Sequence, residues 1–304
     1  MKIKESKRNE MIAYEAFIRR AAAIDMPFVL KGSFVTRQYF SDPNLRIPAD
    51  LDWLYLPKIK KHKQAKKIFD KWAIAVTEYS FLEDNTIFQS FKKNQFWRMI
   101  EYAMEDDFPT VNSDLVAWVN EEELDLFIDI SFNLNKSFPT VPLFYQPIFG
   151  EPFLIKHTVP LYLQIAWKMH QSIVRLRFKD LFDLMHLVIH PTFNKNMVAQ
   201  VMEELIEECE ATNVKTMNLR KFLTFKKKHL QYKNIEKDWL VWRHKDTKTN
   251  HYFYADPITD VSLLPENLDD FLEQFKNTMK NAGFGNHLLS QLASFWVNLT
   301  HNKN

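Results

Sequence analysis

The stretch that decides the fold of this chain is Asp50-Leu51-Asp52-Trp53-Leu54-Tyr55-Leu56. Its apolar residues alternate with aspartate and predict a β-strand from Leu51 to Leu56. Asp50 and Asp52 are two residues apart, so in a strand their carboxylates project from one face. Carboxylates this close repel each other unless a cation lies between them, and Mg²⁺ binds through one or two carboxylates plus substrate phosphates. Taken alone, the pair also fits two solvated aspartates in a turn.

A second turn lies fewer than 20 residues upstream. The apolar run at 28–30 predicts a strand that ends in Lys31-Gly32-Ser33, before a helix expected over 34–40. A strand that ends in a small residue and opens a helix lets backbone N–H groups approach a triphosphate. The Ser33 hydroxyl can donate to a phosphate oxygen, while Lys31 and Arg37 can supply positive charge. The alternative is a tight strand–helix turn without a ligand.

A third carboxylate is available in the strand expected over 124–132. Asp129 lies there among apolar residues, where an unpaired charge is expensive. It would complete a metal site with Asp50 and Asp52. Strand alternation also permits Asp125, four residues earlier on the same face, and the sequence does not choose between them.

The order of expected elements predicts an α+β fold. Helices over 8–24 and 62–78 and strands over 96–104 and 115–120 complete the first half, a small mixed sheet with flanking helices. Prolines from Pro139 to Pro160 predict a long irregular connection, with a domain boundary near Glu151. We therefore expect a catalytic domain at 1–150 and a mostly helical domain at 151–304. The helices expected there are 161–174, 180–189, 197–209, 219–230, 268–280 and 287–299.

The helical half contributes three further candidates. Lys168 lies in a largely apolar helix, so it needs a partner such as a phosphate or Asp180. Asp180 and Asp183 are three residues apart at a helix start and share a face near the positive helix end. For Asp183, simple helix capping is an equally good explanation.

Composition excludes several classes of protein. Four glycines in 304 residues leave no room for a glycine-rich phosphate loop, and the single Cys209 allows neither an internal disulfide nor a thiolate metal cluster. The charged N-terminus predicts no signal peptide, and no stretch approaches the ~20 apolar residues of a membrane span. We expect a cytoplasmic protein, whose formal net charge of +2 does not define a partner.

Together these residues resemble the polymerase-beta-like nucleotidyltransferase superfamily, and within it the AbiEii/AbiGii toxin family. That family opens with an apolar strand, a Gly-Gly or Gly-Ser turn and a downstream arginine, here Leu30-Lys31-Gly32-Ser33 with Arg37. A loop arginine, here Arg46, precedes the Asp-x-Asp pair. Asp129 matches the third carboxylate of the family.

The resemblance to this family covers about residues 27–190, so it extends into the helical half. Thr158-Val159, the helical Lys168, a basic stretch and Lys179-Asp180 with Asp183 follow in the family's order. Three positions depart from the pattern. Lys179 replaces an arginine, which removes a bidentate guanidinium contact. Pro48 stands where Ser or Thr is common, and Trp167 where an acidic residue is usual.

The resemblance implies an Mg²⁺-dependent nucleotidyltransferase that acts as the toxin of a toxin–antitoxin or abortive-infection system. Asp50, Asp52 and Asp129 would bind the metal, with Lys168 and Asp180 also catalytic. The nucleotide, for example GTP or CTP, would contact a wider set: Lys31, Gly32, Ser33, Arg37, Arg46, Lys168 and Asp183. An antitoxin protein would be a partner. A small molecule or protein as acceptor, and a non-catalytic nucleotide-binding module, are the alternatives.

The segment 213–250 suggests an RNA acceptor such as tRNA. It holds 11 Lys or Arg against 3 Asp or Glu, interleaved with aromatic residues. Basic and aromatic side chains together suit a phosphate backbone with stacked bases. A solvated basic helix over a packed aromatic core explains the same composition equally well. The aromatic residues concerned are Phe222, Phe225, Tyr232, Trp239 and Trp242.

Overall fold

The computed structural model describes residues 5–81, 85–100, 109–134, 137–230, 233–244 and 257–289. These residues form two compact units. The first unit runs to Pro160 and takes back a short segment that ends at Asp260, and the second begins at Leu161. None of the described helices is long and apolar enough to cross a membrane.

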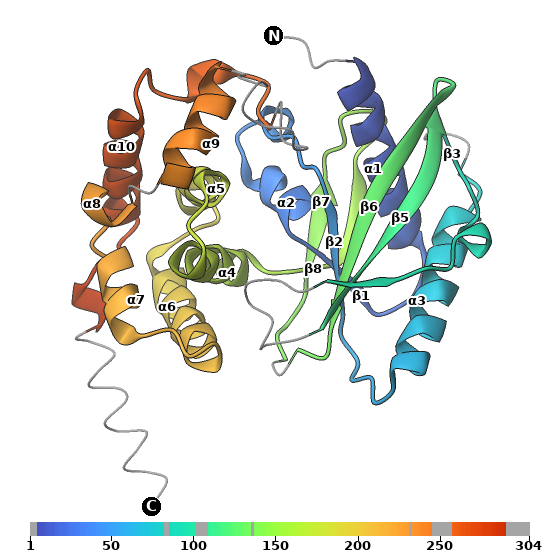
Figure 1. The fold of residues 1–304 in the computed structure, drawn as a ribbon, viewed down its shortest axis with the longest axis horizontal. Coiled ribbons are helices and arrows are strands. Elements are labelled where there is room, and N and C mark those ends of the chain that lie inside the picture. Colours follow the sequence, from blue (N-terminus) through green and yellow to red (C-terminus); the bar gives the residue numbers. More distant parts are fainter. Residues whose placement is uncertain are drawn as a thin grey trace, which may run out of the picture. The chain divides into compact units, whose positions relative to one another are not determined.

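The first unit is built on a mixed β-sheet, with α1 and α3 covering one face (Figure 1). Its helical elements are α1 (Glu5–Ala23), α2 (Ser33–Thr36), η1 (Arg37–Tyr39), η2 (Pro43–Leu45), α3 (His62–Thr77) and η4 (Phe91–Lys93). Its strands are β1 (Phe28–Lys31), β2 (Leu51–Tyr55), β3 (Thr86–Phe88), β4 (Arg98–Ile100), β5 (Thr110–Val119), β6 (Glu122–Phe132), β7 (Val141–Tyr145) and β8 (Phe153–Thr158).

The strands are arranged in the order β3-β5-β6-β2-β1-β8-β7, with β4 paired to β5. β2 lies inside this order, antiparallel to β1 and parallel to β6. The long β5–β6 hairpin turns at Asn120 and Glu121, whose φ angles are 48° and 67°. Two consecutive residues with positive φ give the turn a twist that matches the flanking strands. This hairpin carries Asp129 to the side of β2.

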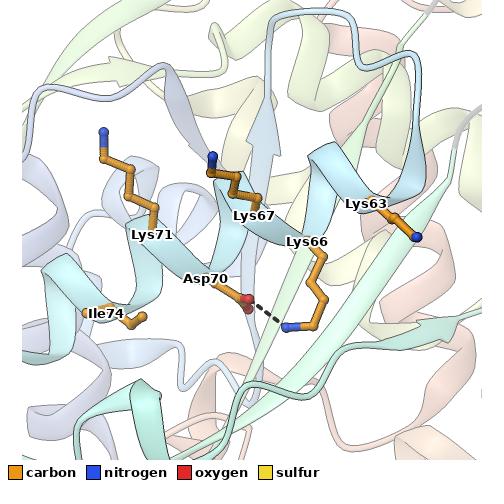
Figure 2. A pocket seen from close by; sticks show the side chains of 6 residues that line it. All are labelled: Lys63, Lys66, Lys67, Asp70, Lys71 and Ile74. Carbon is orange, nitrogen blue, oxygen red and sulfur yellow. Dashed lines mark hydrogen bonds and ion pairs between the residues drawn. The ribbon is translucent and has the colours of Figure 1, made fainter.

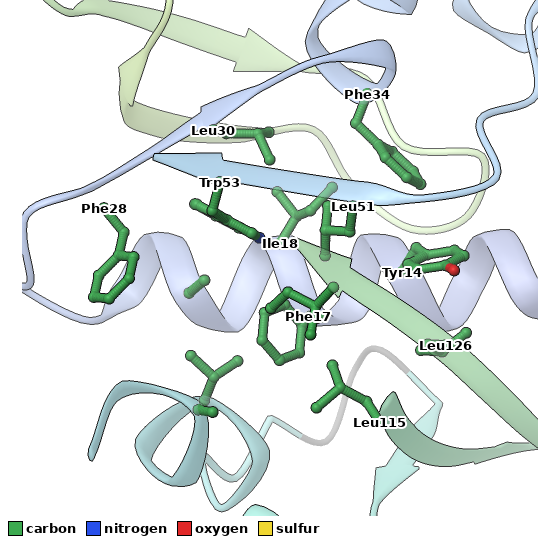
Figure 3. Packing of buried hydrophobic residues seen from close by; sticks show 14 of the residues in the cluster. Tyr14, Phe17, Ile18, Phe28, Leu30, Phe34, Leu51, Trp53, Leu115 and Leu126 are labelled. Carbon is green, nitrogen blue, oxygen red and sulfur yellow. The ribbon is translucent and has the colours of Figure 1, made fainter. Parts of the chain in front are cut away.

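Alternation along β2 separates the core from the site. Leu51 and Trp53 are buried in the core beneath α1 and α3, as Figure 3 shows for the packing around Phe17. Trp53 lies edge-on to Trp72 of α3, with ring centroids 5.1 Å apart. Because successive strand residues point to opposite faces, Asp52 projects away from this core.

The expected α+β class is confirmed, but the connection between Pro139 and Pro160 is not irregular. It contains β7 and β8, and β8 pairs in parallel with β1 through Leu30 and Thr158. Pro142 is tolerated in β7 because this strand lies at the end of the sheet order, and its pairing is irregular there. The first unit therefore continues to Pro160 instead of ending near Glu151.

The second unit is helical over its described residues, as expected. Its elements are α4 (Leu161–Val174), α5 (Phe178–Ile189), α6 (Lys195–Ala211), α7 (Thr216–Phe222), α8 (Lys227–Leu230), α9 (Lys233–His244), η5 (Val261–Leu263) and α10 (Leu268–Asn281). The helix expected over 219–230 is divided between α7 and α8. The helix expected over 287–299 lies mostly outside the described residues.

Candidate active site

The sheet register places two of the predicted carboxylates side by side. Asp52 of β2 pairs with Lys31 of antiparallel β1 on one side and with Asp129 of parallel β6 on the other. Register partners on adjacent strands point to the same face, and neighbouring strands are ~4.8 Å apart. Lys31, Asp52 and Asp129 thus form a row across three strands on the face opposite the core.

Asp50 lies in the bend immediately before β2 and is partly exposed. The Tyr14 hydroxyl holds this bend, because it donates to the Ala49 carbonyl at 3.0 Å and accepts from the Phe127 amide at 3.0 Å. Burial raises the pKa of Tyr14 well above its ordinary value, and the charges of Asp50 and Asp129 add to this rise. Tyr14 therefore ties the approach to β2 onto β6, close to both carboxylates.

Both carboxylate oxygens of Asp52 are located by the β1 turn. Oδ1 lies 3.3 Å from Lys31 Nζ. Oδ2 lies against the Gly32 backbone, where an added Cβ would come within 2.0 Å of it. Gly32 has φ 72° and ψ −152°, a conformation that belongs essentially to glycine. The Gly-Ser turn thus serves the aspartate directly, because no larger residue leaves room for its carboxylate.

Ser33 follows Gly32 and begins α2. Its Oγ is buried and has no hydrogen-bond partner in the described part of the chain. A buried hydroxyl without a partner costs free energy, and this one lies one residue from the glycine that touches Asp52. A ligand oxygen at the β1 turn would satisfy it, and this is the role that the sequence predicts for Ser33.

Asp129 is held by a polar network that the sequence did not predict. The carboxylate is buried and accepts from Asn112 Nδ2 at 2.5 Å. Asn112 Oδ1 in turn accepts from Arg98 Nε at 3.2 Å, and Arg98 Nη1 donates to Asp114 Oδ2 at 2.7 Å. Hydrogen bonding to Asp114 raises the pKa of Arg98, and the charge of Asp129 contributes. Asn112 pairs with Asp129 in the register of β5 and β6, and Asn112 and Asp114 both precede the strand that the sequence predicts over 115–120.

Asp125 lies away from this row. It pairs with Val116 of β5 and is exposed. β2 begins at Leu51, opposite Ile128, so Asp125 lies before the part of β6 that pairs with β2. Of the two candidates for the third carboxylate, Asp129 is therefore the one beside Asp52.

Arg37 has a different setting from the one expected for a nucleotide contact. Its guanidinium is fully buried and forms an ion pair with Glu15 at 2.5 Å, and it also donates to Tyr145 Oη at 3.1 Å and to the Pro43 carbonyl at 2.9 Å. A guanidinium with these partners holds α1, β7 and the loop before β2 together. These contacts give Arg37 a role in the scaffold, and its expected contact with the nucleotide stays a prediction.

Arg46 has a similar structural setting. It is buried, and its Nη1 donates to the Ile47 carbonyl at 2.7 Å and to the Pro257 carbonyl at 3.3 Å. The neighbouring backbone also pairs with this segment, in a bridge from Arg46 to Ile258. Arg46 therefore anchors the returning segment to the loop before Asp50, and its expected contact with a nucleotide stays a prediction.

In the second unit, Lys168 of α4 meets both predicted aspartates of α5. Its Nζ lies 2.8 Å from Asp183 Oδ2 and 3.7 Å from Asp180 Oδ1. Both aspartates are fully buried, whereas the Lys168 side chain keeps 13% of its surface exposed. The expected partner Asp180 is thus the more distant one, and Asp183 forms an ion pair with Lys168 across two helices.

Lys179 replaces the arginine of the family pattern, but Arg177 supplies a guanidinium to Asp180. Its Nε donates to Asp180 Oδ2 at 2.6 Å and its Nη2 to Asp180 Oδ1 at 3.1 Å. Nη2 also donates to Gln171 Oε1 at 2.6 Å. This fork neutralises Asp180, so two cations and two anions balance within the cluster. At the other departure, Trp167 Nε1 donates to Glu208 of α6 at 2.9 Å.

The aromatic residues of segment 213–250 do not form an exposed stacking surface. Phe222, Phe225, Trp239 and Trp242 are buried, and Tyr232 lies outside the described residues. Trp242, for example, lies edge-on to Phe178 at 5.1 Å. These four buried side chains pack in the core of the second unit. The interpretation as a packed aromatic core is therefore confirmed for them, and the prediction that bases stack on them is wrong.

Within the described ranges, no three His, Cys, Asp or Glu side chains converge closely enough to hold a metal ion by themselves. The donor set nevertheless fits Mg²⁺, because Asp52 and Asp129 offer oxygen ligands on one face and Mg²⁺ takes its remaining ligands from phosphates and water. Cys209 is no alternative ligand, since burial raises the pKa of its thiol to about 12.

Comparison with known proteins agrees with the class that this fold and site predict. A family model described as "Nucleotidyl transferase AbiEii toxin, Type IV TA system" matches residues 16–247, more than half of the chain. The chain belongs to this AbiEii family, and it is a nucleotidyltransferase of the toxin type. No curated protein matches it.

Solved structures also match this chain. JHP933 from Helicobacter pylori shares 16% identity, with 98% of this chain and 100% of that chain covered and a TM-score of 0.52. The nucleotidyltransferase toxin MenT4 from Mycobacterium tuberculosis shares 13% identity, with 90% of this chain and 82% of that chain covered and a TM-score of 0.43. At 16% identity, the similarity to JHP933 concerns the fold alone.

Proposed function

We propose that this toxin transfers a nucleoside monophosphate from a nucleoside triphosphate to a hydroxyl group of RNA, with Mg²⁺ bound at Asp50, Asp52 and Asp129. The observation that carries the proposal is the register pair of Asp52 and Asp129, beside a turn whose Ser33 hydroxyl lacks a partner among the described residues. Acidic ligands for a cation and a donor for a phosphate oxygen thus lie at neighbouring strand ends.

The reaction is a displacement at the α-phosphorus of the triphosphate. The acceptor oxygen forms a bond to this phosphorus, the bond to the bridging oxygen breaks, and pyrophosphate leaves. When bound, Mg²⁺ polarises the phosphoryl group and offsets the developing charge. The proton of the acceptor hydroxyl passes to a base, and Asp129 is our candidate, with Asn112 holding its carboxylate in place.

The phosphates require donors and positive charge. Ser33 Oγ donates to one phosphate oxygen, and Lys31, which holds Asp52 Oδ1 at 3.3 Å, adds charge at the same turn. From the second unit we assign Lys168 to the phosphates and Asp180 and Asp183 to its positioning. The nucleotide is GTP or CTP in our proposal, and an antitoxin protein is the expected partner of the toxin.

A labelling experiment tests the proposal. Each α-³²P nucleoside triphosphate is incubated with purified protein and total tRNA, with Mg²⁺ or with EDTA. We expect labelled RNA from at least one triphosphate, lost with EDTA and reduced at least ~100-fold in Asp52→Asn, since a lost metal ligand costs several kcal/mol of transition-state stabilisation. Undiminished labelling by a folded Asp52→Asn variant would overturn the site. Label found only on protein or small molecules would overturn the RNA acceptor.

A further inference from the structure

The first unit carries a strongly basic surface that the proposed reaction does not use. Residues 58–71 contain seven lysines and one aspartate, in a chain whose formal net charge is only +2. Four of these lysines, Lys63, Lys66, Lys67 and Lys71, line a shallow hollow of about 490 Å³ along α3 (Figure 2). We call these four residues the α3 lysine surface. All four are exposed.

Little in the described structure neutralises this surface. Lys66 pairs with Asp70 at 2.5 Å, but Asp70 also accepts from Trp97 Nε1 at 2.9 Å. Lys63, Lys67 and Lys71 have no ion pair among the described residues. They follow one another at intervals of four, ~6 Å apart along the helix axis. Like charges at this spacing destabilise a helix, so the fold gains nothing from them.

The inner face of α3 already supplies the packing that the helix needs. Phe69, Trp72 and Val76 are buried, and the Trp72 ring stacks on Phe28 at 4.1 Å. The outer face adds no comparable apolar side chain, and Ile74 is only partly buried beside the hollow. A membrane surface requires inserted apolar side chains, and a protein interface requires an apolar centre that is poor in lysine. Phosphate groups require only the lysines.

An exposed aromatic side chain lies near the same helix. Trp97 is fixed to α3 by its bond to Asp70 and by its ring contact with Phe69 at 5.7 Å. The preceding residue, Phe96, keeps 58% of its surface exposed. Arg98 Cζ lies 6.0 Å from the centroid of the Phe96 ring, so this exposed ring accompanies Arg98, which bonds to Asn112 beside Asp129.

The surface lies on the sheet face opposite the carboxylates, since α3 packs on Trp53 and Asp52 points the other way. The segment around β4 reaches both faces: Trp97 contacts α3, and Arg98 bonds to Asn112, the partner of Asp129. A mononucleotide is too small to extend from one face to the other, whereas a folded RNA is large enough. We propose that the α3 lysine surface binds the phosphate backbone of the acceptor RNA at a distance from its reacting end.

This inference rests on the proposed function, because it assigns a binding surface to the RNA acceptor. The test variant is Lys63→Gln/Lys67→Gln/Lys71→Gln in the full chain. Its matched control is Lys156→Gln/Lys195→Gln/Lys280→Gln, which removes the same charge from exposed positions outside α3 and outside segment 213–250. Binding of total tRNA is measured by filter binding between 50 and 200 mM salt, together with the melting temperature and the Kd for the labelled triphosphate.

We expect the α3 variant to bind tRNA about tenfold more weakly, with a salt slope smaller by about 3, one unit for each lost phosphate contact. Triphosphate binding stays at the wild-type value, the melting temperature does not fall, and the control variant binds tRNA like the wild type. Wild-type tRNA affinity and salt slope in the α3 variant would overturn this inference, and so would a loss confined to the control. Either result leaves the proposed function intact if the wild type still labels RNA. Absence of RNA labelling by the wild type overturns the proposed function instead.

Discussion

The backbone of Gly32 lies directly against the carboxylate of Asp52, so that a Cβ at position 32 would fall 2.0 Å from Asp52 Oδ2. The two residues are 20 positions apart in the chain and are brought together by the antiparallel pairing of β1 with β2. A glycine at the end of one strand thus makes room for the carboxylate of the next.

Replacing Gly32 by alanine should abolish activity while leaving the protein folded. The new methyl group displaces the Asp52 carboxylate, and a misplacement of ~1 Å can cost ~100-fold in rate. The backbone conformation at φ 72° adds about 1–3 kcal/mol of strain. Radiolabel transfer and urea unfolding measure the two effects.

Gly150→Ala is the matched control for this variant. Gly150 also has a positive φ, 83°, but its nearest atom to an added Cβ is Arg19 Nη2 at 3.6 Å. We expect a similar loss of stability with normal transfer. Equal transfer rates in the two alanine variants would refute a specific role of Gly32 beside Asp52.

Asp129→Asn should reduce transfer at least ~100-fold, whereas Asp125→Asn should leave it within about twofold of the wild type. Asp129 lies beside Asp52, and Asp125 is exposed and lies before the paired part of β6. The amide at position 129 retains the size of the carboxylate but lacks its charge, and a metal-binding group is worth several kcal/mol in the transition state. Steady-state kinetics with labelled triphosphate decide the matter, and the opposite ranking of the two variants would exclude Asp129 as the third carboxylate.

Asp125 and Asp129 also show how much of the site the sequence predicts. Alternation identifies which residues of a strand share a face, so Asp52, Asp125 and Asp129 were all recognisable as candidates. Register is set by pairing between strands that are distant in the chain, and the hydrophobic pattern leaves shifts of two residues open. Only the alignment of Asp52 with Asp129 in the structure separates the two candidates.

The burial and the partners of charged residues are also not predicted by the sequence. A lone sequence contains the charge of Arg37 but not its burial, and the ion pair with Glu15 makes it part of the scaffold. Conversely, the family spacing predicts a basic stretch before Lys179 but does not show that Arg177 bonds to Asp180 at the start of α5. β7 was not predicted because the prolines from Pro139 to Pro160 indicated an irregular connection, whereas an edge strand tolerates a proline.

Lys168 is open to a test that separates a phosphate contact from a structural ion pair. Lys168→Met alone leaves Asp183 buried without its cation, which should cost about 3–5 kcal/mol of stability. In Lys168→Met/Asp183→Asn both charges are removed, Arg177 still neutralises Asp180, and we expect most of the stability to return. The KM for the triphosphate should then be raised about tenfold or more in this folded double variant. Normal kinetics in the double variant would show that Lys168 only stabilises the helical unit.

His170 should make the stability of the helical unit depend on pH. Burial lowers its pKa to about 4, from an ordinary value of 6.5. Its Nε2 lies 2.7 Å from Thr212 Oγ1, and because that hydroxyl donates to the Glu208 carbonyl, Nε2 carries the hydrogen in the neutral ring. Since protonation is favoured in the unfolded chain, the stabilising contribution is complete above pH 6.5 and is lost as the pH falls toward 4.

Between pH 7.5 and pH 5 this contribution should fall by about 2 kcal/mol, because each unit below the unfolded pKa is worth ~1.4 kcal/mol. Urea unfolding of the wild type and of His170→Gln at both pH values isolates it from the carboxylates, which titrate in both proteins. His170→Gln removes the titrating group but keeps a side-chain donor for Thr212. The gap in free energy of unfolding between the two proteins should narrow at pH 5, and a gap that stays constant or widens would rule out a buried neutral His170 as the cause.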